Sequence, residues 1–257
     1  MEIKIDNIKI VYNETGKDSK TNIILLHGWG ANKESFLPVQ GYFSNKFKVY
    51  NIDMPGFGES EKPPITYTVS DYAKIILEFI KMLELDNVVL VGHSFGGRVI
   101  MKLVGELNYK PQKIIFVDSA GVKPKRKFSY YYKVYSYKLF RKIVTLTMGK
   151  KKSEKIINYW RNKVGSEDYK NADNTMREVF KNVVSEDLVP YISNIKVPTL
   201  IVWGENDQDT PLKDARKIES LIEDSGVVVL KNAGHFSYLD NLNEFLIITS
   251  KFLEECE

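Results

Sequence analysis

Ser94 lies in a sequence setting that would make its hydroxyl a nucleophile. Residues 92–96 read G-H-S-F-G, and they follow the apolar run Asn87–Val91 and precede the helix-like stretch Arg98–Leu107. A serine hydroxyl is a weak nucleophile unless it is held in the open and a base can reach its proton. A G-x-S-x-G turn between a strand and a helix exposes the serine, because its glycines leave room for a strained backbone and a closely packed helix. The spacing therefore predicts nucleophilic catalysis at Ser94.

His235 is the predicted base. It is the only histidine C-terminal to Ser94, and it lies between the last expected strand and the last expected helix. A serine nucleophile needs a histidine to take its proton, and in chains with this elbow the acid and then the histidine follow the serine. The alternative is a surface-loop histidine without a catalytic role. His27 and His93 are predicted to be structural, with the His93 side chain pointing away from the substrate.

Four carboxylates are candidates for the acid that orients the histidine. Each comes just after an apolar, strand-like run, where a side chain can turn over the edge of a sheet: Asp118, Glu205, Asp207 and Asp209. The alternative for the last three is that they only cap the helix expected to begin near Pro211. Position alone leaves the choice among the four open.

The loop after the run Asn22–Leu26 is predicted to hold the oxyanion that forms during attack. Residues 27–30 read H-G-W-G, and this loop would face the elbow across neighbouring strand ends. An oxyanion hole needs backbone N–H donors aimed at the developing charge. The expected donors are the amides of Trp29 and of Phe95, the residue after the nucleophile.

Apolar β-branched runs alternate with helical patterns along most of the chain. Strands are expected at Glu2–Glu14 (an antiparallel pair), Asn22–Leu26, Phe47–Ile52, Val88–Val91, Lys113–Val117, Val197–Trp203 and Gly226–Leu230, and helices at Val69–Leu83, Arg98–Leu107, Pro211–Glu223 and Asn241–Glu254. Ser70 is available as a cap for the helix at 69–83. This alternation predicts a mostly parallel sheet covered by helices on both faces.

Five segments together form a specific pattern. They are 26–30 (L-H-G-W-G), 53–60 (D-M-P-G-F-G-E-S), 92–97 (G-H-S-F-G-G), 198–211 and 234–236 (G-H-F). On these segments the chain resembles the α/β-hydrolase superfamily, in the group of carboxylesterase-like serine hydrolases that carry a helical lid. The resemblance covers nearly the whole chain except residues 121–190.

The resemblance implies a domain organisation and selects one acid. Residues 1–120 and 191–257 would form an α/β-hydrolase core, and residues 121–190 a helical lid inserted into it. The family pattern W-G-x-x-D-x-x-x-P matches residues 203–211 and points to Asp207 as the acid. Related epoxide hydrolases and haloalkane dehalogenases carry Asp at the elbow, so Ser94 argues against both chemistries.

The expected lid differs in composition from the rest of the chain. Residues 121–190 hold 17 Lys or Arg against 7 Asp or Glu, and 11 aromatic residues. The aromatic rings would form an apolar roof over an acyl or aryl group, or only fasten the lid helices to the core. The basic residues would form a solvated face, or a patch that attracts an anionic substrate or lipid.

Composition excludes several other classes of protein. A hydrophobic fraction of 43%, a charged fraction of 27% and a net charge of +4 are typical of a soluble globular protein. The first 25 residues contain no signal-peptide core, and Cys256 is the only cysteine, which together predict a cytoplasmic protein. No dinucleotide-binding, metal-ligand or nucleic-acid-binding motif is present. We therefore expect no cofactor, no metal and no nucleic-acid partner, and a membrane surface is disfavoured.

The predicted function is hydrolysis of a carboxylic ester or related acyl compound, with a small-molecule acyl substrate as the partner. Ser94, His235 and Asp207 would be the catalytic residues, with the Trp29 and Phe95 amides as the oxyanion hole. A C–C bond hydrolase acting on a vinylogous diketone, a thioesterase or a lactonase would use the same triad. A ligand receptor or signalling protein that retains the triad without turnover is the alternative outside enzymes. The sequence leaves substrate identity and oligomeric state open.

Overall fold

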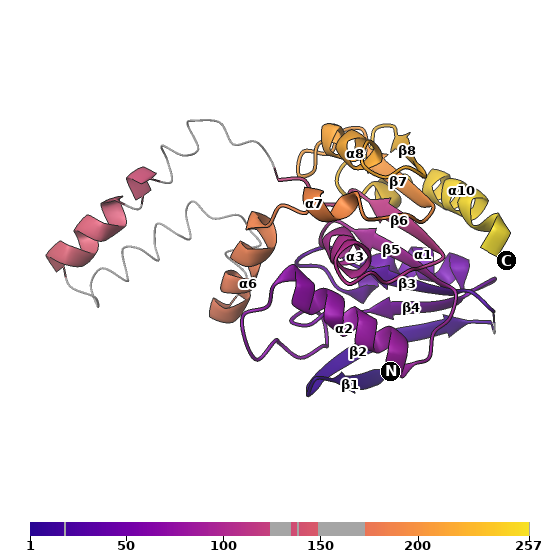
Figure 1. The fold of residues 1–257 in the computed structure, drawn as a ribbon, viewed down its shortest axis with the longest axis horizontal. Helices are drawn as coiled ribbons and strands as arrows, with labels where there is room; N and C mark the ends of the chain where they lie inside the picture. The colour runs from indigo at the N-terminus through magenta and orange to yellow at the C-terminus, as the bar shows by residue number, and fades with distance from the viewer. Residues whose placement is uncertain (18, 124–134, 138, 149–172, 257) are drawn as a thin grey trace. The chain divides into compact units, whose positions relative to one another are not determined.

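A computed structural model describes residues 1–257 apart from 18, 124–134, 138, 149–172 and 257 (Figure 1). The chain divides into two compact units, residues 1–123 with 181–257, and residues 124–180. In the second unit, residues 135–137 and 139–148 are helical. Most of the aromatic and basic residues on which the expected lid depends lie outside the described residues. The lid at 121–190 therefore stays a prediction.

One eight-stranded sheet forms the centre of the first unit. Its strands are β1 (Glu2–Ile5), β2 (Ile8–Gly16), β3 (Asn22–Leu26), β4 (Lys48–Ile52), β5 (Val88–His93), β6 (Lys113–Val117), β7 (Thr199–Gly204) and β8 (Ser225–Leu230). Their order is β1-β2-β4-β3-β5-β6-β7-β8. β2 pairs antiparallel with both β1 and β4, and every other pairing is parallel. This arrangement confirms the predicted α/β fold with a mostly parallel central sheet.

Helices cover both faces of this sheet, as expected for parallel strands joined by crossovers. The helices of this unit are α1 (Leu37–Phe43), α2 (Val69–Met82), α3 (Phe95–Gly105), α7 (Val189–Ile192), α8 (Leu212–Glu219), α9 (Ser237–Asp240) and α10 (Leu242–Leu253), with short 3-10 helices η1 (Lys33–Phe36) and η2 (Glu254–Cys256). A further helix, α6 (Asn174–Ser185), spans the boundary between the two units. Side chains alternate along β3, so Ile23 and Leu25 enter one core with Val39 of α1 and Phe245 of α10. On the other face, α3 packs on β5 and β3 and against α2 (Figure 1).

The start of α2 differs from the expected cap. Thr68, not Ser70, is the N-cap, because its side chain accepts from the Asp71 N–H while the Asp71 carboxylate accepts from the Thr68 N–H. This reciprocal capping box satisfies two amides that lack a helical partner. Ser70 lies inside the first turn, and its hydroxyl donates instead to Glu106 Oε1 at 2.8 Å.

The parallel strands bring the chemically interesting residues to one edge of the sheet. The carboxyl ends of parallel strands meet at the same edge, so the residues that follow them are neighbours across the sheet. His27 follows β3, Ser94 follows β5, Asp118 follows β6, and Asp207 and His235 lie in the loops after β7 and β8.

No helix in the described part of the chain is long and apolar enough to cross a membrane.

Candidate active site

Ser94 is held in a strained turn between β5 and α3. Its φ is 48° and its ψ is −105°, a conformation of a kind that costs a non-glycine residue about 1–3 kcal/mol. The Ser94 N–H donates to the Val117 carbonyl at 3.0 Å, and the Ser94 carbonyl accepts from the Ala120 N–H at 3.1 Å. These bonds to the end of β6 fix the turn and leave the serine partly exposed. The helix predicted from Arg98 in fact begins at Phe95, directly after the serine.

Two positions in this turn require glycine, because neighbouring backbone atoms occupy the space that a Cβ atom would need. A Cβ on Gly96 would lie 2.1 Å from the Leu26 carbonyl oxygen, and a Cβ on Gly92 would lie 2.7 Å from backbone atoms of Gly96 and Gly97. Neither clash can be relieved by rotating a side chain. The glycines of the G-x-S-x-G pattern are therefore required by the close approach of α3 to β3 and β5.

Replacement of Gly96 by alanine is expected to destabilise the protein by about 1–3 kcal/mol or more, the usual cost of overpacking a rigid site. Equilibrium unfolding in urea measures this difference. Gly41→Ala is the matched control, because a Cβ on Gly41 meets nothing within 4 Å. Gly41 lies inside α1, where alanine should stabilise by about 0.5–1 kcal/mol. An unchanged urea midpoint for Gly96→Ala would contradict the packing described here.

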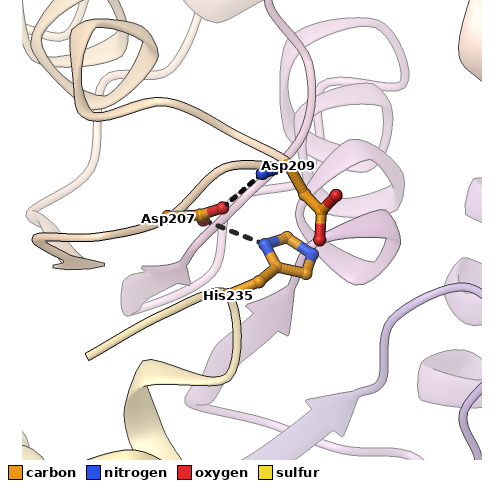
Figure 2. A group of neighbouring side chains, drawn as sticks. All are labelled: Asp207, Asp209 and His235. Atoms are coloured by element: carbon orange, nitrogen blue, oxygen red, sulfur yellow. Dashed lines mark hydrogen bonds and ion pairs between the residues drawn. The ribbon is translucent and has the colours of Figure 1, made fainter.

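Ser94, His235 and Asp207 form one hydrogen-bonded chain. His235 Nε2 lies 3.0 Å from Ser94 Oγ, and His235 Nδ1 lies 2.9 Å from Asp207 Oδ2. Figure 2 shows the Asp207–His235 half of this chain. With its proton on Nδ1, the ring donates to the carboxylate and leaves Nε2 free to accept the serine proton. The arrangement can therefore activate the serine hydroxyl and stabilise the imidazolium that results.

The Asp207 carboxylate is fixed by its own loop as well as by His235. Its Oδ1 accepts from the N–H groups of Asp209 and Thr210 at 2.8 and 2.9 Å, and its Oδ2 accepts from the Thr210 hydroxyl at 2.6 Å. Trp203 Nε1 in turn donates to the Thr210 carbonyl at 2.6 Å. Thr210 was not predicted as part of the site, although an Asp that accepts from the amides two and three residues on is a common turn.

Hydrogen bonds and charges set the protonation states of the pair. Burial by itself would raise the pKa of Asp207, but the hydrogen bonds from His235 and then Thr210 bring it below its ordinary value. Burial by itself would lower the pKa of His235. The hydrogen bond and the negative charge of Asp207, with smaller effects of the Asp118 and Asp209 charges, raise the His235 pKa above 6.5. Asp207 is thus ionised at neutral pH, and His235 is a stronger base than free histidine.

The activity should depend on pH through His235. The imidazole must be neutral to accept the serine proton, so kcat/KM should fall as the pH drops through the His235 pKa. Because that pKa is raised, the midpoint of this acid limb should lie above 6.5. A profile of kcat/KM against pH on a neutral ester measures it. An acid limb with a midpoint below 6.5 would contradict this assignment of the base.

The other two histidines are buried and neutral. His27 Nε2 accepts from the Met54 N–H at 3.1 Å, and Nδ1 donates to the Gly28 carbonyl at 2.7 Å. His93 Nε2 donates to the His235 carbonyl at 2.7 Å. Burial lowers the pKa of His27 to about 4 and that of His93 to about 3. His27 thus links its loop to the segment after β4, and His93 links the elbow to the main chain of the base.

The residues predicted to form the oxyanion hole pack against each other. The Trp29 ring lies edge-on to that of Phe95, with centroids 5.4 Å apart, and also to that of Phe57 at 4.9 Å. Phe95 is the first residue of α3, so its N–H is one of the four that have no acceptor within the helix. That the Trp29 and Phe95 amides bind an oxyanion stays a prediction.

The structure distinguishes Asp207 from the other three candidates for the acid. Only Asp207 is hydrogen-bonded to His235. Glu205 Oε2 accepts from the Asn232 N–H at 3.1 Å, and both Asp118 oxygens accept from backbone amides. Asp209 is exposed, and Figure 2 shows its carboxylate beside the His235 ring.

Asp207, Asp209 and His235 also have side chains of metal-ligating type. Their ligand atoms lie within 4.8 Å of one another, and among the described residues they are the only such group of three. However, Asp207 Oδ2 already accepts from His235 and Thr210, so a cation there would have to displace the bonds of the proton-relay chain. The donor set fits the hydrogen-bonded triad better than a metal centre.

Comparison with known proteins identifies the family. Residues 21–242 match the family model for the alpha/beta hydrolase fold. The chain is 26% identical to a 2-hydroxy-6-oxo-6-(2'-aminophenyl)hexa-2,4-dienoic acid hydrolase of Metapseudomonas resinovorans, over 98% of this chain and 89% of that protein. It is 23% identical to a pimeloyl-[acyl-carrier protein] methyl ester esterase of Proteus mirabilis, over 96% and 97% of the two chains.

Solved structures agree with this likeness. An esterase from Exiguobacterium antarcticum superposes with a TM-score of 0.74 at 24% identity, over 98% of this chain and 97% of that one. At this identity the superposition speaks for the fold alone. The family model covers most of the chain, and its match includes the elbow, the acid loop and the histidine. The chain belongs to the α/β-hydrolase fold family.

Proposed function

We propose that this enzyme is a serine hydrolase that cleaves a carboxylic ester or a related acyl compound through an acyl-enzyme. The observation that carries the proposal is the unbroken hydrogen-bonded chain from Ser94 Oγ through His235 to Asp207. A chain of this kind removes the serine proton as the oxygen attacks, which is the difficult part of acyl transfer. Esterases and lipases among the relatives support the same reaction class.

The proposed mechanism assigns one role to each group. Ser94 Oγ attacks the carbonyl carbon while His235 Nε2 takes the hydroxyl proton, and the amides of Trp29 and Phe95 donate to the oxyanion. His235 then protonates the leaving alcohol, which departs and leaves an ester on Ser94. Water, deprotonated by His235, hydrolyses that ester and regenerates the serine. Asp207 holds the imidazole orientation and stabilises its charged form throughout.

A C–C bond hydrolase is the second candidate, because a relative that covers most of the chain is named as the hydrolase of a dienoic acid. In the acid named there, the 6-oxo carbonyl and the carboxylate are at opposite ends of a six-carbon chain. The exposed carboxylate of Asp209 beside His235 therefore does not discriminate between the two reactions.

A fluorophosphonate probe and a panel of nitrophenyl esters of varied acyl length test the proposal. Wild-type protein should be labelled at Ser94 and should turn over at least one neutral ester. Absence of labelling, or equal labelling of Ser94→Ala, would refute the serine-hydrolase function. Labelling without turnover of any ester would favour the C–C hydrolase or a receptor, and cleavage of a vinylogous diketone acid would decide between those two.

A further inference from the structure

Asp118 is a fully buried carboxylate that the mechanism above does not use. It directly follows β6, has no exposed area, and has a φ of 44°, which is unusual for a residue other than glycine. A buried carboxylate is costly unless its oxygens are hydrogen-bonded. The partners of Asp118 are therefore informative about its role.

Each oxygen of the Asp118 carboxylate binds a different catalytic loop. Oδ1 accepts from the Gly204 N–H at 2.8 Å, at the end of β7 and three residues before Asp207. Oδ2 accepts from the Ser237 N–H at 3.0 Å, two residues after His235. One side chain thus bridges the loop of the acid and the loop of the base.

The main chain of Asp118 adds two further contacts on the acid side. Its N–H donates to the Val202 carbonyl at 3.0 Å, which continues the pairing of β6 with β7. Its carbonyl oxygen lies 3.0 Å from the Thr210 hydroxyl oxygen, which donates its single proton over the shorter distance of 2.6 Å to Asp207 Oδ2. The Thr210 hydroxyl therefore lies between the Asp118 carbonyl and the Asp207 carboxylate that orients the base.

We propose that Asp118 is a positioning residue, which holds the loops of Asp207 and His235 at the spacing that their hydrogen bond requires. The inference rests on the proposed function, because it concerns the efficiency of that triad. Asp118 touches neither the substrate nor the reacting atoms, and it acts through the backbone at Gly204 and Ser237. The His93 ring at the end of β5 also donates to the His235 carbonyl. The loop of His235 is therefore held both from β5 and from Asp118, the residue after β6.

Charge gives Asp118 a second route to the base. Its negative charge, after the effects of Asp207, contributes to the raised pKa of His235, as does Asp209. Burial raises the pKa of Asp118 itself to about 7, against the hydrogen bonds from the Gly204 and Ser237 amides, which favour the ionised form. The ionised carboxylate accepts both amides in charge-assisted hydrogen bonds, which are stronger than those made to a neutral carboxyl group.

Asp118→Asn tests the proposal because it retains the shape and removes one acceptor and the charge. The new NH₂ group must face one of the two backbone N–H donors, so one bond is lost. We expect kcat on a nitrophenyl ester to fall about 10- to 100-fold, the scale for displacing a catalytic group by about 1 Å, with KM changed much less. The acid limb of kcat/KM should move to lower pH, because loss of a negative charge lowers the His235 pKa.

Asp53→Asn is the matched control for loss of a buried carboxylate. Asp53 is equally buried and also accepts two backbone amides, from Lys33 at 2.7 Å and Glu59 at 2.9 Å. It is in addition ion-paired with Lys33 Nζ at 2.8 Å, and none of these partners belongs to the loops of Asp207 and His235. It should lose stability while its acid limb stays in place. Asp118→Glu retains the charge but displaces the oxygens, so its kcat should fall without a shift of the acid limb.

Rates are measured at low temperature and in the presence of sucrose, which favours the folded state of destabilised variants. Each rate is divided by the concentration of folded protein. Wild-type kcat together with an unmoved acid limb in Asp118→Asn would overturn the positioning role. If the asparagine variant does not fold, wild-type kcat in Asp118→Glu would overturn it instead. The two proposals fail differently: without labelling or turnover of the wild type the proposed function fails, whereas an active wild type with an equally active Asp118→Asn refutes only this inference.

Discussion

Ser94→Ala is expected to lower kcat on any ester substrate by about 10⁴- to 10⁶-fold, the range found when the nucleophile of such a triad is removed. No other group in the chain of hydrogen bonds can form the acyl-enzyme, because His235 Nε2 then has no hydroxyl to deprotonate. The Thr210 hydroxyl lies 3.3 Å from Nδ1, the nitrogen that is bonded to Asp207. The variant should retain its fold, since the bonds that fix the turn come from the Ser94 main chain. Steady-state kinetics and fluorophosphonate labelling measure the loss, and circular dichroism checks the fold.

Ser119→Ala is the local control for this prediction. The Ser119 hydroxyl is buried next to the elbow and donates to the Gly92 carbonyl at 2.9 Å, but it is not bonded to His235. Its removal should cost about 1 kcal/mol of stability and leave labelling of Ser94 intact. If Ser119→Ala abolished labelling and Ser94→Ala retained it, the nucleophile would be misassigned.

Asp207→Asn should lower kcat by about 10⁴-fold, because an amide favours the wrong tautomer of the histidine. The asparagine NH₂ donates where the carboxylate accepts, so His235 Nδ1 becomes the acceptor and Nε2 carries the proton that blocks attack. The acid limb should also move to lower pH, since the charge that raises the His235 pKa is lost. Combined with Ser94→Ala, the change should cost little more, because the two residues act as one unit.

The neighbouring carboxylates provide the controls for the acid. Asp209→Asn and Glu205→Gln remove the two nearby alternatives, neither of which is hydrogen-bonded to His235. Each variant should retain kcat to within about tenfold, as is usual for exposed charges that make no hydrogen bond to the group they act on. A loss at Asp209 as large as that at Asp207 would assign the orienting role to the wrong carboxylate.

Local sequence patterns were sufficient to predict the sheet and the elements that position the site. Apolar runs such as Lys113–Val117 became strands with those bounds, because a strand buried on both faces is apolar along its whole length. Helix starts were less well predicted. The first turn of α3 contains Gly96 and Gly97, which weaken a helical pattern, and the capping box at Thr68 depends on side-chain geometry.

Some residues of the site could likewise be predicted from the sequence, and others could not. Ser94 and His235 could be chosen from the sequence, since one has a distinctive setting and the other is the only histidine that follows it. Asp207 needed the family pattern, because three acids share its loop. The bridging role of Asp118 could not be assigned, since it depends on contacts with residues 86 and 119 positions away in sequence, which local spacing does not encode.

The hydrogen bonds that hold the triad in place determine which parts of the sequence can change without disturbing it. Every hydrogen bond described above for Ser94, Asp207 and His235, and for the groups that fix them, is made within residues 1–123 and 181–257. Exchange of residues 124–180 for the corresponding segment of another relative removes no partner of these bonds. We therefore expect that segment to be able to change in length and composition without loss of the groups that carry out the reaction.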